Sequence, residues 1–269
     1  MGTITKALDL LNLFSPARPQ IGLGEVVRLT GRDKATLHRH LSELEENGFL
    51  EQHPVTRAYR LGPALLRLAA VREAAFPMRA LLRPIVTELS EAVGELAHAS
   101  LLQGAVLSPV FHADPRLHGT QVHFDASEVL PLHATSSGLA VLAFAPDALR
   151  RRILARPLSM HTGRTITDPE RLRGLIDEVR RTGISRLDGA FDEEVASQGV
   201  PLFGEDGRVI GAISVAVPTV RDRPDRQEDI ARHLRAAARA ASLSLGAREA
   251  DLVAPDPAGP APQTQGDRP

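Results

Sequence analysis

One stretch constrains this chain more than any other: residues 33–47, DKATLHRHLSELEEN. Leu37, Leu41 and Leu44 recur at the i, i+4, i+7 spacing that places them on one face of an α-helix. The opposite face carries small and polar side chains around one arginine, namely Ala35, Arg39, Ser42 and Glu46. The spacing predicts an amphipathic helix, and an ordinary helix on a protein surface would have the same pattern.

The outward face of this helix has side chains that suit a DNA duplex. Arg39 can reach a phosphate or a guanine edge, and Thr36 or Ser42 can take a nearby base or phosphate. Basic and imidazole side chains crowd the start of the helix, where free N–H groups also favour a phosphate. They are Arg32, Lys34, His38, Arg39 and His40.

The segments before this helix favour a helix-turn-helix. Residues 3–14 have one apolar face and end at Ser15-Pro16, and residues 24–30 form a second, shorter helix. Gly31 then supplies a tight turn and Asp33 can cap the third helix. A helix, a short helix, a turn with glycine and a further helix are typical of this motif.

The segment after the helix predicts a wing, that is, a hairpin beside the recognition helix. FLEQ and YRLG read as short strands, joined by a loop that bears Arg57. Arg57 and Arg60 are candidate phosphate contacts, or simply solvated charges of a hairpin. Residues 63–75 begin with a proline, have high helix propensity and predict a connecting helix.

The second half predicts an α+β domain with a mostly antiparallel sheet and packed helices. Expected strands lie at 96–102, 105–112, 121–124, 184–188, 197–203 and 208–217, and expected helices at 84–93, 136–145, 146–155, 169–182 and 226–245. Residues 250–269 are rich in Pro, Gly, Gln and Asp and cannot build a core, so we expect them to be disordered.

Length and composition limit the class of protein. A chain of 269 residues suits about two domains. It contains no cysteine, which excludes disulfides and thiolate metal sites. A net charge of -1 disfavours indiscriminate coating of nucleic acid but allows a small DNA-binding module. No signal peptide or run of roughly 18 apolar residues is present, so we expect a cytoplasmic protein without a membrane partner.

The order of several motifs closely resembles the IclR (isocitrate lyase regulator) family of bacterial transcription factors. The N-terminal motifs are ITKALDLLNLF, LTGRDKATLHRHLSELEENGFLEQ and YRLG; the later ones are LPLHATSSGLAVLAF and DEEVASQGVPLFGEDGRVIGAISVAVP. The resemblance covers about residues 3–246. It implies a winged helix-turn-helix (1–62), a linker helix (63–76), a GAF-like effector and oligomerisation domain (77–247) and a disordered tail (248–269).

The resemblance also implies function and partners. A homodimer or homotetramer would bind a palindromic operator in double-stranded DNA and respond to a small organic effector such as an aromatic or aliphatic acid. We expect a repressor of a catabolic or neighbouring operon, without a cofactor. The implied DNA-binding residues are Arg32, Lys34, Ala35, Thr36, His38, Arg39, Ser42 and Arg57. The implied effector-binding residues are Ser136, Ser137, Asp188, Ser197 and Ser214.

The sequence departs from the family pattern near the implied pocket. Leu139 stands where many members have lysine, Ala190 where glutamate is common, and Glu194 where glycine is common. Ser197 stands where some members have cysteine. These changes alter the charge of the pocket, so the ligand class does not carry over from the family.

Three alternatives remain at this point. The altered pocket could bind no ligand, leaving a regulator controlled by its abundance. Ser137, His133 and Asp188 are the residue types of a hydrolase, but the G-x-S-x-G elbow is absent from the sequence. Five histidines of the second half lack cysteine partners and metal-ligand spacing, which argues against a metal site; they are His98, His112, His118, His123 and His133.

Overall fold

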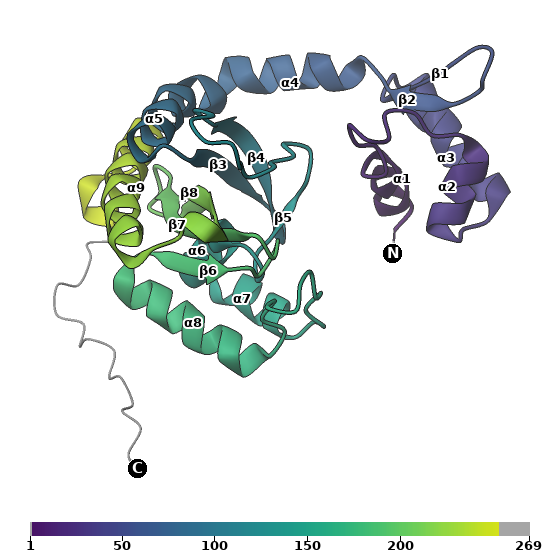
Figure 1. The fold of residues 1–269 in the computed structure, drawn as a ribbon. Helices are drawn as coiled ribbons and strands as arrows, with labels where there is room; N and C mark the ends of the chain where they lie inside the picture. The colour runs from purple at the N-terminus through teal and green to yellow at the C-terminus, as the bar shows by residue number, and fades with distance from the viewer. Residues whose placement is uncertain (1, 253–269) are drawn as a thin grey trace. The chain divides into compact units, whose positions relative to one another are not determined.

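The computed structural model describes residues 2–252, which fall into two compact units, one ending at Pro77 and the other beginning at Met78 (Figure 1). The elements of the first unit are α1 (Thr3–Leu11), α2 (Leu23–Thr30), α3 (Lys34–Glu46), β1 (Leu50–Gln52), β2 (Tyr59–Leu61) and α4 (Ala64–Ala75). No helix among residues 2–252 has both the length and the hydropathy needed to cross a membrane.

The first unit is a helix-turn-helix followed by the predicted hairpin. The buried face of α3 contributes Leu37 and Leu41 to a small core, which Tyr59 of β2 completes. Gly31 ends α2 in the left-handed conformation, with φ of 63°, and so makes the turn into α3. These local features fix the direction in which α3 presents its outward face.

Two details of this unit differ from expectation. The first helix ends at Leu11 and not at Phe14, with Asn12 as its C-cap. His40 is not beside the outward face: its side chain is buried. Neither of its ring nitrogens has a hydrogen-bond partner among the described residues. His40 lies one residue from Leu41 and three from Leu37, so it falls near the edge of the apolar stripe and turns inward.

The second unit is built on an antiparallel six-stranded sheet in the order β5-β4-β3-β8-β7-β6. The strands are β3 (Leu96–Gln103), β4 (Val106–Ala113), β5 (Leu130–Pro131), β6 (Ser185–Asp188), β7 (Val195–Phe203) and β8 (Val209–Pro218). The helices are α5 (Met78–Val93), α6 (Ser136–Phe144), α7 (Asp147–Leu154), α8 (Pro169–Thr182) and α9 (Pro224–Ser244), with 3-10 turns at Thr219–Arg221 and Glu249–Asp251.

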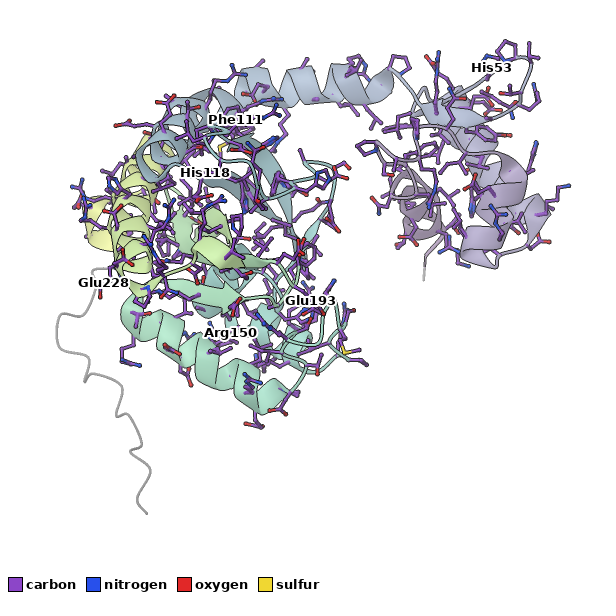
Figure 2. The ribbon with its side chains drawn as sticks, in the orientation of Figure 1. His53, Phe111, His118, Arg150, Glu193 and Glu228 are labelled. Atoms are coloured by element: carbon purple, nitrogen blue, oxygen red, sulfur yellow. The ribbon has the colours of Figure 1, made fainter. Side chains whose placement is uncertain are left out.

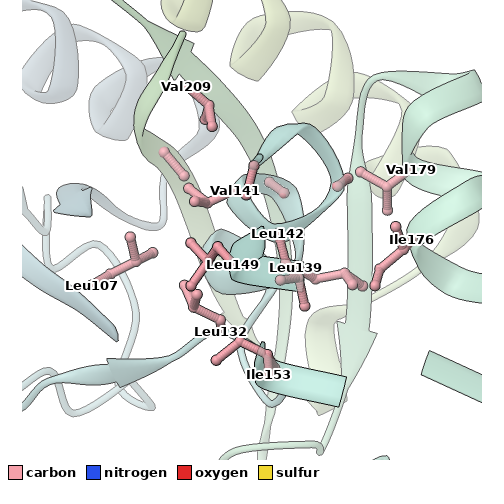
Figure 3. Close-up of a cluster of buried hydrophobic side chains, with 14 of the residues drawn as sticks. Leu107, Leu132, Leu139, Val141, Leu142, Leu149, Ile153, Ile176, Val179 and Val209 are labelled. Carbon is pink, nitrogen blue, oxygen red and sulfur yellow. The ribbon is translucent and has the colours of Figure 1, made fainter. Parts of the chain in front are cut away.

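Two apolar layers enclose the sheet. Helices α5 and α9 cover one face, where Leu82 and Leu234 pack against Val215 of β8. Helix α6 covers the other face and is buried along its whole length except for Phe144. Helices α7 and α8 pack outside α6, so that Leu142 and Ile176 belong to one cluster (Figure 3). A helix buried on all sides is a rigid support for whatever its N-terminus contacts.

The strand expected at residues 121–124 is absent, and β5 pairs with β4 instead. The alternating apolar and polar residues of that segment pack side chains against the sheet and do not form a strand. Phe124 lies against His98 and His112, with ring centroids 4.8 and 5.0 Å apart. The sequence pattern was therefore a wrong guide to secondary structure here.

The ordered chain also extends beyond the boundary expected at residue 248. Arg239 forms a paired hydrogen bond with Glu249, with both distances at 2.7 Å, and Leu252 packs against the α6 cluster. Residues 248–252 are thus part of the second unit and not of a disordered tail. The rest of the predicted tail, residues 253–269, lies outside the described residues.

Candidate functional site

The outward surface of α3 is formed as the sequence predicts. The Asp33 carboxylate accepts a hydrogen bond from the Thr36 N–H at 2.8 Å, and this bond lowers the pKa of Asp33. The cap starts the helix at Lys34 and so sets the rotation of every later side chain. We call the residues of this surface the α3 surface. Its exposed or partly exposed members are Lys34, Ala35, Thr36, His38, Arg39 and Ser42, and the exposed Glu43 and Glu46 lie toward the end of the helix.

Arg32 lies next to the α3 surface but is held by α1. Its guanidinium donates to the Lys6 carbonyl and to the Asp9 carboxylate, each at 3.0 Å. The ion pair neutralises the charge of Arg32 within the unit and ties α1 to the turn before α3. Arg32 therefore has a structural task that the sequence did not indicate.

Arg57 is exposed in the loop of the hairpin. His53, which Figure 2 labels, begins the same loop. Arg57 has a left-handed backbone with φ of 58°, and its N–H donates to the His53 carbonyl at 2.9 Å. Arg60, the second candidate phosphate contact, is instead paired with Glu51 at 2.6 Å. Of these two arginines, Arg57 is the one whose charge remains available.

The second unit contains a cavity of ≈ 170 Å³ beside the N-terminus of α6, which we call the α6 pocket. Three predicted effector residues line it: Ser136, Ser137 and Ser197. A cavity of about 150 Å³ is large enough for benzene. The α6 pocket therefore has room for one small ring or a short aliphatic chain.

The two other predicted effector residues do not line the α6 pocket. The Asp188 carboxylate ends β6 and is paired with Arg164, with both oxygens 3.1 Å from the same nitrogen. It borders a different cavity on the α9 side of the sheet. Ser214 is fully buried beneath the pocket, between Ala216, which lines it, and Ala212 of the core. Ser214 therefore faces the same side of the sheet as His98 and Ala216 but is covered, whereas the Asp188 side chain is held outside the α6 pocket by Arg164.

The floor of the pocket is held close to the sheet by contacts of α6. Thr135 caps the helix by accepting a hydrogen bond from the Gly138 N–H at 3.0 Å. Ser185 donates to the Ser136 carbonyl at 2.6 Å. Gly199 of β7 permits this approach, because a Cβ atom there would lie 2.7 Å from the same carbonyl. Small and hydroxyl-bearing residues therefore position the Ser136 and Ser137 end of α6 at the pocket.

His98 is a pocket residue that the sequence analysis did not identify as a site residue. It lies on β3 opposite Ser214, and its Nδ1 is hydrogen-bonded to Ser100 at 3.1 Å. Burial, together with the neighbouring His112, lowers the pKa of His98 from 6.5 to about 4. His98 is therefore neutral near pH 7. The alternation of His98 with Ser100 on one face of a buried strand was the available signal.

The departures from the family pattern differ in their effect on the pocket. Leu139 points into the α6 cluster and does not line the pocket. Ala190 does line it, and next to Ala190 the Phe191 ring forms part of the wall. Glu194 is exposed and its N–H donates to Asp192, which borders the pocket. The leucine therefore affects the core, whereas the alanine affects the cavity.

Ser137, His133 and Asp188 do not have the geometry of a hydrolase triad in this unit. Ser137 donates to Thr135 at 3.3 Å, and His133 donates to the Ser159 carbonyl at 2.9 Å. Asp188 is engaged by Arg164. The three residues thus have separate partners and form no relay. The part of the chain that the structure describes also holds no group of His, Asp and Glu side chains suited to a metal ion.

The chain was compared with known protein families and sequences. Residues 3–54 match the family described as IclR helix-turn-helix domain, and residues 74–243 match the family described as Bacterial transcriptional regulator IclR C-terminal. The HTH-type transcriptional regulator KipR of Bacillus subtilis (strain 168) is 29% identical over 248 residues, which cover 91% of this chain and 97% of that protein. These relatives are transcriptional regulators and not enzymes.

Solved structures give the same result. The structure of an IclR transcriptional regulator from Silicibacter sp. TM1040 has 45% sequence identity and a TM-score of 0.86, covering 94% of this chain and all of that one. An IclR homologue from Microbacterium hydrocarbonoxydans, complexed with 4-hydroxybenzoate, has 27% identity and a TM-score of 0.73, covering 91% of this chain and 99% of that one.

Proposed function

Because the chain belongs to the IclR family of bacterial transcriptional regulators, we propose that this DNA-binding regulator is a repressor controlled by a small organic molecule. The α3 surface binds the operator, and the α6 pocket binds the effector. The observation that carries the proposal is the presence, in one chain, of a helix whose exposed face bears Lys34 and Arg39 and of a cavity of ≈ 170 Å³. A relative with bound 4-hydroxybenzoate supports a ligand of this size.

On the DNA side, two copies of α3 enter successive major grooves of a palindromic operator in the cytoplasm. Arg57 contacts the DNA backbone beside α3. The bases and phosphates are faced by the residues of the α3 surface, namely Lys34, Ala35, Thr36, His38, Arg39 and Ser42. Arg32 contributes by holding α1 against the turn. The α3 surface carries the two unpaired basic side chains Lys34 and Arg39, so specificity rests on few base contacts.

The proposal includes a homodimer or a dimer of dimers. Apolar side chains on two helices of the first unit support it, since Ile4 of α1 and Leu66 of α4 are 77% and 76% exposed. Helix α4 has no buried residue at all within the described chain. Association of two chains would cover such side chains and set the spacing of the two α3 helices.

Footprinting of the DNA just upstream of the gene and its divergent neighbour, over a salt series, tests the operator part. We expect a protected palindrome with half-sites about one helical turn apart. The Arg39→Ala variant should lose the protection, and Arg208→Ala, which removes an exposed arginine of the second unit, should keep it. Equal protection by both variants, or none by the wild type, would contradict the proposal.

Addition of aromatic and aliphatic compounds to the same assay tests the sensing part. A compound that binds in the α6 pocket and releases the operator is the expected result. If no compound that binds in the pocket changes the protection of the operator, the DNA-binding part of the proposal stands and the effector part is contradicted.

A further inference from the structure

The charge of the α6 pocket is set by acidic side chains at its border. Asp125, Glu128 and Asp192 line the cavity. None of its lining residues, within residues 2–252, is a lysine or an arginine. The Arg164 side chain lies against Gly189, next to the pocket residue Ala190, but its guanidinium is already paired with Asp188. The electrostatic potential at the entrance is therefore negative.

The acidic side chains are held in different ways. The Asp125 carboxylate accepts hydrogen bonds from Ser127, which lower its pKa, and Asp192 accepts one from the Glu194 N–H at 3.0 Å. Both are thus fixed at the border by their own loops. Glu128 is exposed, and although its N–H donates to the Asp125 carbonyl at 3.1 Å and its charge acts on the His161 ring, its carboxylate has no hydrogen bond or ion pair among the described residues. Its carboxylate is the one free to meet a ligand.

The inner wall of the pocket is aromatic and uncharged. Phe124 lies 4.8 Å from the His98 ring, and Phe191 lies 5.0 Å from the His161 ring. Phe124, Phe191 and His98 all line the cavity. His98 is buried, and burial disfavours a positive charge on its ring. The pKa of the exposed His161 is also lowered, first by desolvation and then by His133, while Glu128 acts in the opposite direction. The side chains of the inner wall thus offer no cation to a carboxylate ligand.

One feature of the pocket favours an anion, namely the N-terminus of α6 with the N–H groups of Ser136 and Ser137. The helix dipole corresponds to about half a charge, whereas the border carries three carboxylates. A neutral oxygen atom, as in a hydroxyl or carbonyl group, can accept a hydrogen bond from these N–H groups. Because it carries no negative charge, the carboxylates of the border do not repel it. The balance of charge therefore disfavours an acid.

We propose that the α6 pocket selects a small aromatic or apolar amine, with its ring against Phe124 and Phe191 and its ammonium group toward Glu128, over the acid of the same shape. The inference rests on the proposed function of the pocket as the effector site. It differs from the expectation of an acid that the family resemblance gives.

Binding of benzylamine, benzyl alcohol and benzoate to the full-length protein tests this assignment, because the three compounds share a ring and differ in charge. Binding is measured by calorimetric titration at pH 8, above the usual titration range of histidine. We expect benzylamine to bind about tenfold more tightly than benzoate, with benzyl alcohol between them. The preference should shrink as salt increases.

Two variants locate the effect. Glu128→Gln keeps the shape of the side chain, and we expect it to weaken benzylamine about threefold while leaving benzyl alcohol unchanged. Glu193→Gln is the matched control, because Glu193 is exposed on the loop between β6 and β7 and does not line the pocket (Figure 2). It should change none of the three affinities by more than about twofold.

Tighter binding of benzoate, equal loss in both variants, or no binding of any of the three compounds would overturn the charge assignment. Operator binding is measured separately, so the two proposals fail in different ways. Release of the operator by benzoate would contradict the amine preference and leave a ligand-controlled regulator. Absence of operator binding would contradict the proposed function whatever the pocket prefers.

Discussion

The two candidate sites of this chain are built in opposite ways. The α3 surface comes from one continuous helix, Lys34–Glu46, whose inner face is buried and whose outer face is free. The α6 pocket takes residues from β3, from the loop at residues 122–128, from α6, and from β7 and β8. One site depends on a single local spacing, and the other depends on how distant segments pack.

This difference predicts how each site responds to substitution. Side chains of the α3 surface contribute little to the core, so changing them should alter contacts with DNA and leave the fold intact. Side chains around the α6 pocket also pack against the sheet, so changing them should alter the stability of the second unit together with ligand binding.

The largest effect is expected from the buried His98. The pKa of His98 is 6.5 in the unfolded state and about 4 in the folded state. Between these two pH values the unfolded state therefore binds a proton and the folded state does not. Stability is therefore lost as pH falls from 6.5 toward 4, by about 3 kcal/mol in total and by about 2 kcal/mol between pH 7 and pH 5. His98→Gln should remove this part of the pH dependence.

Urea unfolding and amide hydrogen exchange at pH 7 and pH 5 measure this difference. Protection of β3 and β8 amides should fall with pH more steeply in the wild type than in His98→Gln. Protection in α3 serves as the internal reference and should respond equally in both proteins. Identical pH profiles in β3 would show that His98 is not held neutral, and an effect on α3 would break the separation of the two sites.

The next effect concerns the close approach of α6 to the sheet. Gly199→Ala places a Cβ atom 2.7 Å from the Ser136 carbonyl, and we expect a loss of about 1–3 kcal/mol, near the upper end because backbone must move. Gly163→Ala is the control, since a Cβ there meets nothing within 4 Å. Thermal unfolding of the two variants measures the difference. Equal melting temperatures would mean that α6 does not lie against Gly199.

Arg39→Ala tests the α3 surface, where we expect loss of binding without loss of stability. If Arg39 contacts a base, the operator affinity should fall by about 2 kcal/mol, with the unfolding curve unchanged. Arg208→Ala should leave both quantities as they are. An unchanged operator affinity in Arg39→Ala would exclude Arg39 from the interface, and a lower melting temperature would mean that the outer face of α3 also supports the fold.

The smallest effect is expected from Arg57→Ala at the tip of the hairpin. A single phosphate contact should weaken operator and non-operator DNA alike, by less than about 1 kcal/mol, and reduce the salt slope by about one. Anisotropy titrations over a salt series measure that slope. Loss confined to the operator sequence would mean that Arg57 contacts bases rather than phosphates.

The same contrast explains how far the sequence could predict the structure. Local signals sufficed for α3 and its Asp33 cap. The family resemblance, and not a local signal, pointed to Ser136, Ser137 and Ser197, which lie beside one cavity. Contacts between distant segments decided the rest: Asp188 is paired with Arg164, and Phe124 packs on His98 in place of a predicted strand. Even the inward turn of His40 depends on a core that α1 and Tyr59 complete.

The most direct test of this account is a titration of an operator duplex with the full-length wild type and with Ser137→Ala, each with and without saturating benzylamine. If the α3 surface and the α6 pocket are separate sites that are energetically coupled, benzylamine should weaken operator binding of the wild type by at least about fivefold. Ser137→Ala should then bind the free operator normally and lose much of that response. A changed affinity of ligand-free Ser137→Ala, or a full response in that variant, would contradict it.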